Sequence, residues 1–324
     1  MKATIELIRS ITKGALRVTE ENGLVCFHRF TPYQQEVLRA RNFHPREIAT
    51  AGIRLEFTCL VGEVRIVYTD FKGGSTNRFA LDATINGVDV IFENRDIAPE
   101  DIHTCTFTVP KCDKPARVAI YLPNFAGLRI KELYLPEGVQ PVEKKGRLLC
   151  LGDSITQGAV SQRNRLAYAN LTADLLDMEL LNQGIGGDKF HAPNIDPELP
   201  FAPDIITVAY GTNDWAASIP DLAGKIDDYF KKLRTVYPEA PVFAIPPLWR
   251  GNTDGVVRNG LTLADARELV REKAEKYGCI AVDPLPLVPH NEAFFADKVL
   301  HPNDLGFVLY GTQLAEIIKN TLKL

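Results

Sequence analysis

The first part of the chain alternates apolar and polar side chains in short runs. These runs cover residues 53–61, 63–69, 79–85, 88–92, 104–109, 116–122 and 128–135. A period of two residues is typical of half-buried β-strands. Asn86-Gly87 lies between two runs and predicts a tight hairpin, because both central positions of such a turn need positive φ. Many strands at short spacing predict an all-β, jelly-roll-like sandwich over residues 1–140.

The pattern changes after a segment that is poor in apolar residues. Residues 136–146 read PEGVQPVEKKG, and we place the linker between the two parts of the chain at residues 141–146. From residue 147 onward, short apolar runs alternate with longer stretches of helical periodicity. This alternation predicts a three-layer α/β/α domain with a parallel, flavodoxin-like sheet over residues 147–324. In such domains, ligands bind at the carboxyl ends of the strands.

Polar blocks occur where the strands of this second domain should end. They are GDSIT at 152–156, NQGIGGD at 182–188, YGTND at 210–214 and DKVLHPND at 297–304. Because the carboxyl ends of parallel strands share one edge of the sheet, these blocks can form a single site although they are distant in sequence.

The residue types in these blocks suit acyl transfer. That chemistry needs a hydroxyl nucleophile, a base and donors for an oxyanion. Ser154 supplies the hydroxyl, and its N–H is free at the start of the next helix. His301 is the candidate base, and the Asn213 amide can donate a hydrogen bond. The adjacent Asp153 is interpreted as a structural residue of the loop.

In their order, the four blocks resemble those of the SGNH hydrolases, also called GDSL esterases and lipases. The resemblance covers residues 147–324 and implies an SGNH-type fold. It implies Ser154 as nucleophile and His301 as general base. It also implies an oxyanion hole formed by the N–H groups of Ser154 and Gly187 and by the Asn213 amide.

The third member of the triad departs from the family pattern. The family carries its acid three residues before the histidine, where this chain has Lys298, and Asp297 stands four residues before His301. We expect Asp297 to complete the triad if the loop bulges. The alternative is a Ser–His dyad in which a backbone carbonyl orients the imidazole.

The N-terminal part resembles the β-sandwich that precedes the hydrolase domain in a subset of this family, on its strand pattern and on HRFTPYQQ at 28–35. Some of these members are carbohydrate acetyl esterases. We therefore predict a serine esterase, without cofactor, acting on short-chain acyl esters, above all acetyl esters, of carbohydrates or other small polar alcohols. The alternatives are an acyltransferase using the same acyl-enzyme and an inert carbohydrate-binding protein.

Three further residues follow strand ends and are candidates for an acyl or sugar pocket. They are Trp215, Trp249 and Arg250, and ordinary packing is an equal alternative for the two tryptophans. His191 and His290 lie in loops of the same half and are candidates for the border of the site.

Composition excludes other classes of protein. The net charge is −4 and no long basic run occurs, which argues against a nucleic-acid partner. No apolar stretch reaches the length of a membrane span. Charged residues interrupt the N-terminal apolar positions, as a signal peptide would not allow, so we expect a cytoplasmic protein. No metal-binding or nucleotide-binding motif is present, so we expect neither a metal nor a cofactor. The oligomeric state is left open.

Overall fold

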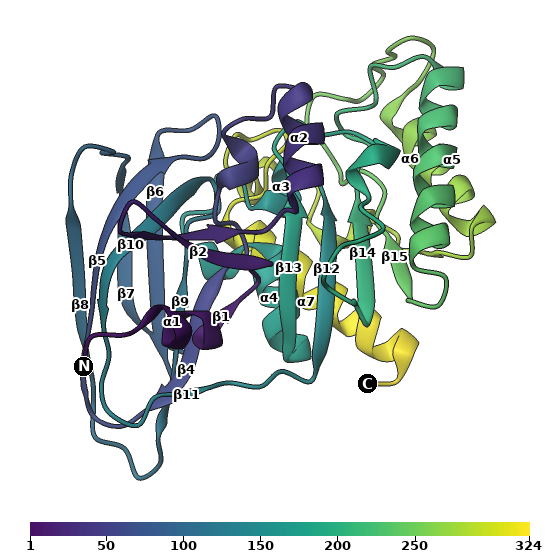
Figure 1. Ribbon diagram of the computed structural model, residues 1–324. Coiled ribbons are helices and arrows are strands. Elements are labelled where there is room, and N and C mark those ends of the chain that lie inside the picture. Colours follow the sequence, from purple (N-terminus) through teal and green to yellow (C-terminus); the bar gives the residue numbers. More distant parts are fainter.

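The computed structural model describes residues 1–324 and consists of two antiparallel sheets followed by one parallel sheet (Figure 1). The antiparallel strands are β1 (Thr12–Lys13), β2 (Arg17–Glu21), β3 (Leu24–His28), β4 (Arg54–Cys59), β5 (Gly62–Lys72), β6 (Arg78–Ile85), β7 (Val88–Asp96), β8 (His103–Val109), β9 (Ala116–Tyr121), β10 (Ala126–Tyr134) and β11 (Gln140–Pro141). One sheet has the order β1-β4-β9-β6-β7, with β11 beside β4, and the other has the order β2-β3-β10-β5-β8.

The two antiparallel sheets enclose the first hydrophobic core. Phe57 and Phe79 enter it from one sheet, and Ile66 and Leu128 enter it from the other; all four are almost fully buried. Asn86 has a φ of 50° at the turn between β6 and β7, as the predicted hairpin requires. The alternating pattern therefore predicted the sandwich correctly, because one face of each strand is buried against the opposite sheet.

The N-terminal part also contains helices that the sequence analysis did not predict. These are α1 (Ile5–Ile11), α2 (Pro32–Ala40) and the 3-10 turn η1 (Arg46–Ile48). Helix α2 begins at a capping box in which the Thr31 hydroxyl accepts from the Gln34 N–H and the Gln34 side chain accepts from the Thr31 N–H. The cap and the contacts of α2 with the C-terminal half stabilise a helix that is too short to be stable alone.

The parallel sheet has the order β13-β12-β14-β15-β16. Its strands are β12 (Gly146–Gly152), β13 (Met178–Gly184), β14 (Ile205–Ala209), β15 (Val242–Ala244) and β16 (Ile280–Ala281). The helices are α3 (Ser154–Gln157), α4 (Tyr168–Leu176), α5 (Ile219–Val236), α6 (Leu263–Lys276) and α7 (Asp304–Leu322), and the 3-10 turns are η2 (Asn164–Leu166), η3 (Ala192–Asn194), η4 (Leu285–Leu287) and η5 (Glu292–Phe294). None of the helices is long and apolar enough to cross a membrane.

Helices cover both faces of this sheet, as the alternation of strands and helices predicted. Leu149 and Leu151 of β12 belong to the core under α5 and α6, whereas Leu148 and Cys150 belong to the core under α4 and α7. Successive residues of a buried parallel strand thus enter opposite cores. The fold is a three-layer α/β/α domain beside an antiparallel sandwich, with α5 and α6 furthest from the sandwich (Figure 1).

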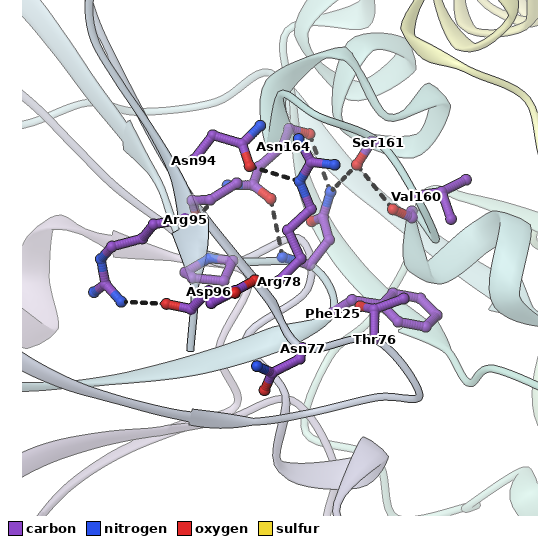
Figure 2. A pocket seen from close by; sticks show the side chains of 14 residues that line it. Thr76, Asn77, Arg78, Asn94, Arg95, Asp96, Phe125, Val160, Ser161 and Asn164 are labelled. Atoms are coloured by element: carbon purple, nitrogen blue, oxygen red, sulfur yellow. Dashed lines mark hydrogen bonds between the residues drawn. The ribbon is translucent and has the colours of Figure 1, made fainter. Parts of the chain in front are cut away.

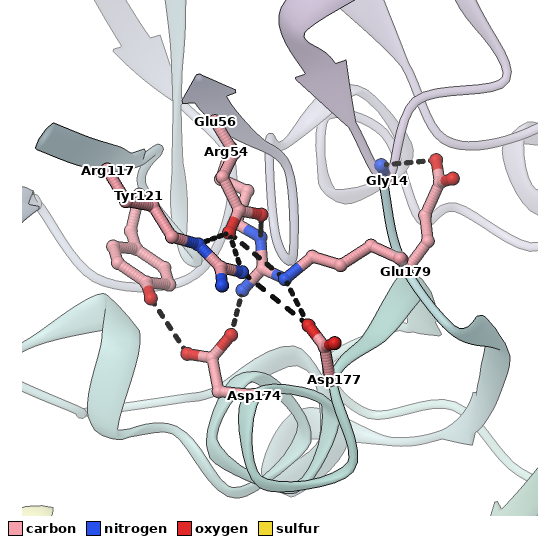
Figure 3. Close-up of polar contacts among 9 residues, drawn as sticks. Gly14, Arg54, Glu56, Arg117, Tyr121, Asp174, Asp177 and Glu179 are labelled. Atoms are coloured by element: carbon pink, nitrogen blue, oxygen red, sulfur yellow. Dashed lines mark hydrogen bonds and ion pairs between the residues drawn. The ribbon is translucent and has the colours of Figure 1, made fainter. Parts of the chain in front are cut away.

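A buried ionic cluster joins the sandwich to the parallel sheet (Figure 3). Arg54 of β4 is 2% exposed and pairs with Glu56 at 2.9 Å and with Asp174 of α4. The Tyr121 hydroxyl donates to Asp174 at 2.7 Å, and the Lys144 ammonium donates to Glu56 at 3.0 Å. Because breaking a buried ion pair leaves an uncompensated charge, this cluster fixes the two parts against each other. The domain boundary at residues 141–146 remains our prediction.

Candidate active site

A tight turn from strand to helix presents Ser154 at the carboxyl edge of the parallel sheet. Strand β12 ends at Gly152, where a Cβ atom would lie 2.0 Å from the Thr156 hydroxyl oxygen, so only glycine fits. The Asp153 carboxylate accepts the Ile155 N–H at 3.0 Å and caps α3. Ser154 is the first residue of this helix. The predicted structural role of Asp153 thus corresponds to an N-terminal cap.

The Ser154 hydroxyl lies within hydrogen-bond distance of the His301 imidazole. The distance from Oγ to Nε2 is 2.9 Å. On the other side of the ring, His301 Nδ1 lies 2.7 Å from the Asp297 carboxylate. With Nδ1 protonated and donating to the carboxylate, Nε2 is free to accept the serine proton. The structure therefore brings together the three residues that the sequence analysis proposed as a triad.

The loop before His301 explains how an acid four residues away reaches the imidazole. Lys298 adopts a left-handed conformation with a φ of 62°, so the chain bulges directly after Asp297. The second carboxylate oxygen of Asp297 accepts the N–H groups of Val299 at 3.0 Å, Leu300 at 2.7 Å and His301 at 3.0 Å. Partial burial raises the pKa of Asp297, but these hydrogen bonds outweigh it and lower the pKa to about 2. The carboxyl group is therefore ionised at neutral pH.

The sequence analysis predicted three oxyanion donors, which are the N–H groups of Ser154 and Gly187 and the Asn213 amide. The Ser154 N–H is at the first position of α3, before the first intrahelical acceptor. Gly187 has a φ of 84°, is exposed, and its N–H makes no hydrogen bond within the protein. The Asn213 side-chain amide donates to the Asp188 carbonyl at 3.0 Å and lies 3.4 Å from the Asp153 carboxylate. The amide is thus placed between the residue after Gly187 and the residue before Ser154.

Each of the three predicted donor residues has a buried aspartate next to it in the sequence. Asp153, Asp188 and Asp214 are each at most 3% exposed. Burial, together with the charges of Asp214 and Asp188, raises the pKa of Asp153 to about 7, although the hydrogen bond from the Ile155 N–H opposes this shift. An acid whose pKa is raised above the unfolded value of 3.8 holds a proton in the folded state that it loses on unfolding. Its contribution to stability is therefore present at low pH and is lost as pH rises through about 7.

We expect Asp153→Asn to flatten the pH dependence of stability. In the wild-type protein, the Asp153 contribution to the free energy of unfolding falls between about pH 4 and pH 7, and the substitution should remove a decrease on the order of 2 kcal/mol. Urea unfolding at pH 5 and pH 8 measures the difference. Asp101→Asn, at an exposed position, is the control and should keep the wild-type difference. An unchanged difference in Asp153→Asn would contradict the assignment.

The N-terminal half contributes side chains to this site. Arg41, directly after α2, pairs with the buried Asp188 carboxylate at 2.8 Å. Its guanidinium lies 4.9 Å from the centre of the Phe43 ring. Phe43 in turn is the side chain nearest to Gly187, 3.8 Å from where a Cβ atom would lie. Sequence analysis missed Arg41 and Phe43 because neither lies in a motif and both precede the catalytic half by more than 100 residues.

We expect Arg41→Met to lower kcat about tenfold and stability by about 2–3 kcal/mol. The substitution leaves the buried Asp188 carboxylate without its partner. The backbone carbonyl of Asp188 accepts from the Asn213 amide and thereby orients it. Steady-state kinetics on p-nitrophenyl acetate and urea unfolding measure the two effects. Arg39→Met is the matched control, since Arg39 lies two residues earlier, within α2, and pairs with Glu47 instead of Asp188; it should leave kcat unchanged. A wild-type kcat in Arg41→Met would show that Arg41 only stabilises the fold.

The three candidate pocket residues occupy different positions. Trp215 is 1% exposed, and its indole N–H donates to the Leu261 carbonyl at 2.9 Å, so the prediction of a pocket role is corrected to core packing. Trp249 is half-buried and stacks on His290 with 5.7 Å between ring centres. Arg250 is half-buried; burial lowers the pKa of its guanidinium, which the nearby Asp297 charge opposes.

The other polar groups do not form a metal site. No group of three or more His, Cys, Asp or Glu side chains is arranged to hold a metal ion. His191 is half-buried, and burial lowers its pKa to about 4, so its imidazole is neutral at pH 7. The chemistry of the site thus depends on the groups around Ser154, which can transfer protons through His301 and stabilise an oxyanion with N–H donors.

Comparisons with known proteins agree with the sequence motifs. Residues 150–309 match the GDSL-like lipase/acylhydrolase family. An acetylxylan esterase / glucomannan deacetylase of Cellvibrio japonicus (strain Ueda107) is 27% identical over 208 residues, which are 53% of this chain and 52% of that protein. The chain thus spans about half the length of this curated relative.

Solved structures share the whole fold. The salicylyl-acyltransferase SsfX3 from a tetracycline biosynthetic pathway superposes with a TM-score of 0.78 and 17% identity, over 96% of this chain and 94% of that one. The acetyl xylan esterase Est2A from the rumen bacterium Butyrivibrio proteoclasticus superposes with a TM-score of 0.66 and 16% identity, over 100% of this chain and 98% of that one. At these identities the likeness concerns the fold alone. The family match, the four motif blocks and the parallel sheet together show that the C-terminal half of the chain, over residues 150–309, belongs to the GDSL-like lipase/acylhydrolase family, as its resemblance to the SGNH hydrolases predicted.

Proposed function

We propose that the chain is a serine esterase in which Ser154, His301 and Asp297 form the catalytic triad. The observation that carries this proposal is the hydrogen-bonded series from the serine hydroxyl through the imidazole to the carboxylate, at 2.9 and 2.7 Å. His301 takes the proton of Ser154 as the hydroxyl oxygen attacks the ester carbonyl carbon. The ionised Asp297 keeps the imidazole in the required tautomer and stabilises the imidazolium.

The proposed oxyanion hole consists of the N–H groups of Ser154 and Gly187 and the amide of Asn213. It stabilises the negative charge on the former carbonyl oxygen. When the tetrahedral intermediate collapses, the bond to the alcohol oxygen breaks and His301 donates its proton to that oxygen. Water then attacks the acyl-enzyme by the same route, with His301 as base, and releases the acid and the free Ser154 hydroxyl.

We further propose that the acyl group is short, above all acetyl. The name of the Cellvibrio japonicus relative supports an acetylated carbohydrate as the substrate.

A substrate panel tests this proposal. We expect hydrolysis of p-nitrophenyl acetate and of acetylated xylo-oligosaccharides, a strong decrease for p-nitrophenyl octanoate, and no activity above background for Ser154→Ala. Equal rates for acetate and octanoate would contradict the short acyl group. Activity on p-nitrophenyl acetate without any activity on acetylated sugars would contradict the carbohydrate substrate.

The two alternatives from the sequence analysis give different products in the same panel. An acyltransferase would release little acetate with water alone and would form a new ester when an acceptor alcohol is added. An inert carbohydrate-binding protein would hydrolyse nothing, and the hydrogen-bonded Ser154 and His301 argue against it. Chromatography of the products with and without methanol or a free sugar distinguishes the three cases.

A further inference from the structure

A polar pocket lies between the sandwich and the loop that follows α3 (Figure 2). Its volume is about 610 Å³, within the range of pockets that hold small organic ligands. Strands β6 and β7 supply one wall, and the loops at residues 123–125 and 158–164 supply the other. The pocket therefore exists only because the sandwich is docked on the catalytic half. Neither Ser154, His301 nor Asp297 is among its lining residues.

One wall carries free donors and free acceptors side by side. Figure 2 shows Arg78 extended toward Asn94, whose side-chain oxygen accepts from the Arg78 Nε at 2.6 Å. The two terminal nitrogens of Arg78 make no hydrogen bond within the protein, and neither does the Asn94 side-chain nitrogen. The exposed Asp96 carboxylate has neither a hydrogen bond nor an ion pair. A ligand hydroxyl, which both donates and accepts, can use both kinds of group.

The charges of the pocket favour a neutral ligand. The guanidinium of Arg95 is already paired with the buried Asp70 carboxylate at 2.6 Å. The remaining cation, Arg78, faces Asp96 on the neighbouring strand, and the two charges offset each other without forming an ion pair. A site for an anion would instead present an excess of positive charge. The lining is mostly amide, hydroxyl and charged groups with one aromatic ring, Phe125. A polyhydroxylated, uncharged molecule, which is to say a carbohydrate, matches this combination.

The opposite wall is fixed before any ligand arrives. Asn124 and Asn164 are each 2% exposed. The Asn164 side-chain nitrogen donates to the Ala80 carbonyl at 2.7 Å, and its oxygen accepts the Asn124 N–H at 3.1 Å. These bonds connect the loop after α3 with β6 and with the loop after β9. A wall that is already ordered loses little conformational entropy when a ligand binds.

Several links connect the segments that line the pocket with the segments of the proposed active site. Gly158 lines it and directly follows α3, the four-residue helix that begins at Ser154. The Phe125 ring also lies 3.2 Å from where a Cβ atom of Gly186 would be, next to the proposed oxyanion donor. On the far side, the Gln162 N–H donates at 2.8 Å to Asp304, three residues after His301.

We propose that this pocket is a carbohydrate subsite that binds sugar units flanking the esterified one. The proposal rests on the proposed function for its role in catalysis, but the binding itself does not require an ester. An ester of a single small alcohol would not reach the pocket, whereas an oligosaccharide would occupy both sites. The subsite would then select polymeric or oligomeric substrates over small esters.

Kinetics with two substrates test the role in catalysis. We expect Arg78→Ala to lower kcat/KM about tenfold for acetylated xylohexaose, through KM, and to leave kcat/KM for p-nitrophenyl acetate unchanged. Unchanged activity on the small ester also shows that the variant is folded. Arg271→Ala, a half-exposed arginine on α6, is the matched control and should affect neither substrate. Equal effects of Arg78→Ala on both substrates, or no effect on either, would overturn the proposal.

Binding of oligosaccharides without ester groups separates this inference from the esterase proposal. Calorimetric titrations of Ser154→Ala with xylohexaose, mannohexaose and cellohexaose should give binding to at least one of them. Adding Arg78→Ala should weaken that binding about tenfold. Binding that depends on Arg78 supports the subsite even if the chain proves to hydrolyse no sugar ester. Absence of binding to all three, or binding that Arg78→Ala does not change, would overturn the inference whatever the esterase activity.

Discussion

Replacing Ser154 with alanine is expected to lower kcat/KM for p-nitrophenyl acetate by about 10⁴- to 10⁶-fold. The Ser154 oxygen is the only hydroxyl placed 2.9 Å from the His301 base, so its loss removes the acyl-enzyme route. The remaining donors can still polarise the ester and support a slow direct attack by water. Initial rates at high enzyme concentration measure the residual activity. A burst of p-nitrophenol equal to the enzyme concentration should occur in the wild-type protein and be absent in the variant.

A second serine at a helix start provides the control for Ser154→Ala. Ser218 is exposed, and its hydroxyl accepts the Asp221 N–H as the cap of α5. Ser218→Ala should cost about 1 kcal/mol in stability and leave the rate unchanged. His301→Ala should be nearly as inactive as Ser154→Ala, and the double variant should be no worse than either, because the two residues act as a unit. More than a few per cent residual activity in Ser154→Ala would place the nucleophile elsewhere.

The fold could largely be predicted from the sequence because its periodicities reflect burial. The strands of the sandwich have one buried face, so their apolar residues alternate, whereas β12 is buried on both faces and reads as an apolar run. Helix α2 escaped prediction although its capping box, Thr31 with Gln34, is a local signal, because the helix is short and its packing partners are distant in sequence. The Gln34 side-chain nitrogen donates to Gln183 at 3.0 Å and to the Asn194 carbonyl at 2.9 Å, which are contacts that no local pattern reveals.

The candidate site could be predicted in part for a related reason. Groups that do chemistry, such as Ser154 and His301, occur in short blocks with a recognisable order. Groups that only hold these residues in place, such as Arg41, follow no motif, because any side chain that reaches Asp188 with the right charge could serve. Trp215 shows the opposite error, in which a residue was predicted for the pocket but lies in the core. A large aromatic residue after a strand end fits either place. Contacts between the two halves of the chain therefore had to come from the structure.

Asp297→Asn is expected to lower kcat about 10⁴-fold while leaving the loop intact. An asparagine oxygen can still accept the Leu300 N–H, but its nitrogen would face His301 Nδ1 as a donor. The imidazole would then carry its proton on Nε2, where it cannot accept the proton of Ser154. Because the pKa of Asp297 is about 2, the wild-type carboxylate stays ionised down to about pH 4, and its titration should not appear in the pH profile of kcat above that pH.

Asp297→Ala separates the two tasks of this carboxylate. It removes the acceptor for the N–H groups of Val299, Leu300 and His301, so we expect a lower melting temperature in addition to the loss of activity. Asp297→Asn should keep a melting temperature close to that of the wild-type protein. If Asp297→Asn keeps more than about a tenth of the wild-type kcat, a backbone carbonyl orients the imidazole and the enzyme works with a Ser–His dyad. The left-handed Lys298 would then serve only to shape the loop. The departure from the family spacing would mean that this chain has lost the catalytic acid, and not that the acid has moved by one residue.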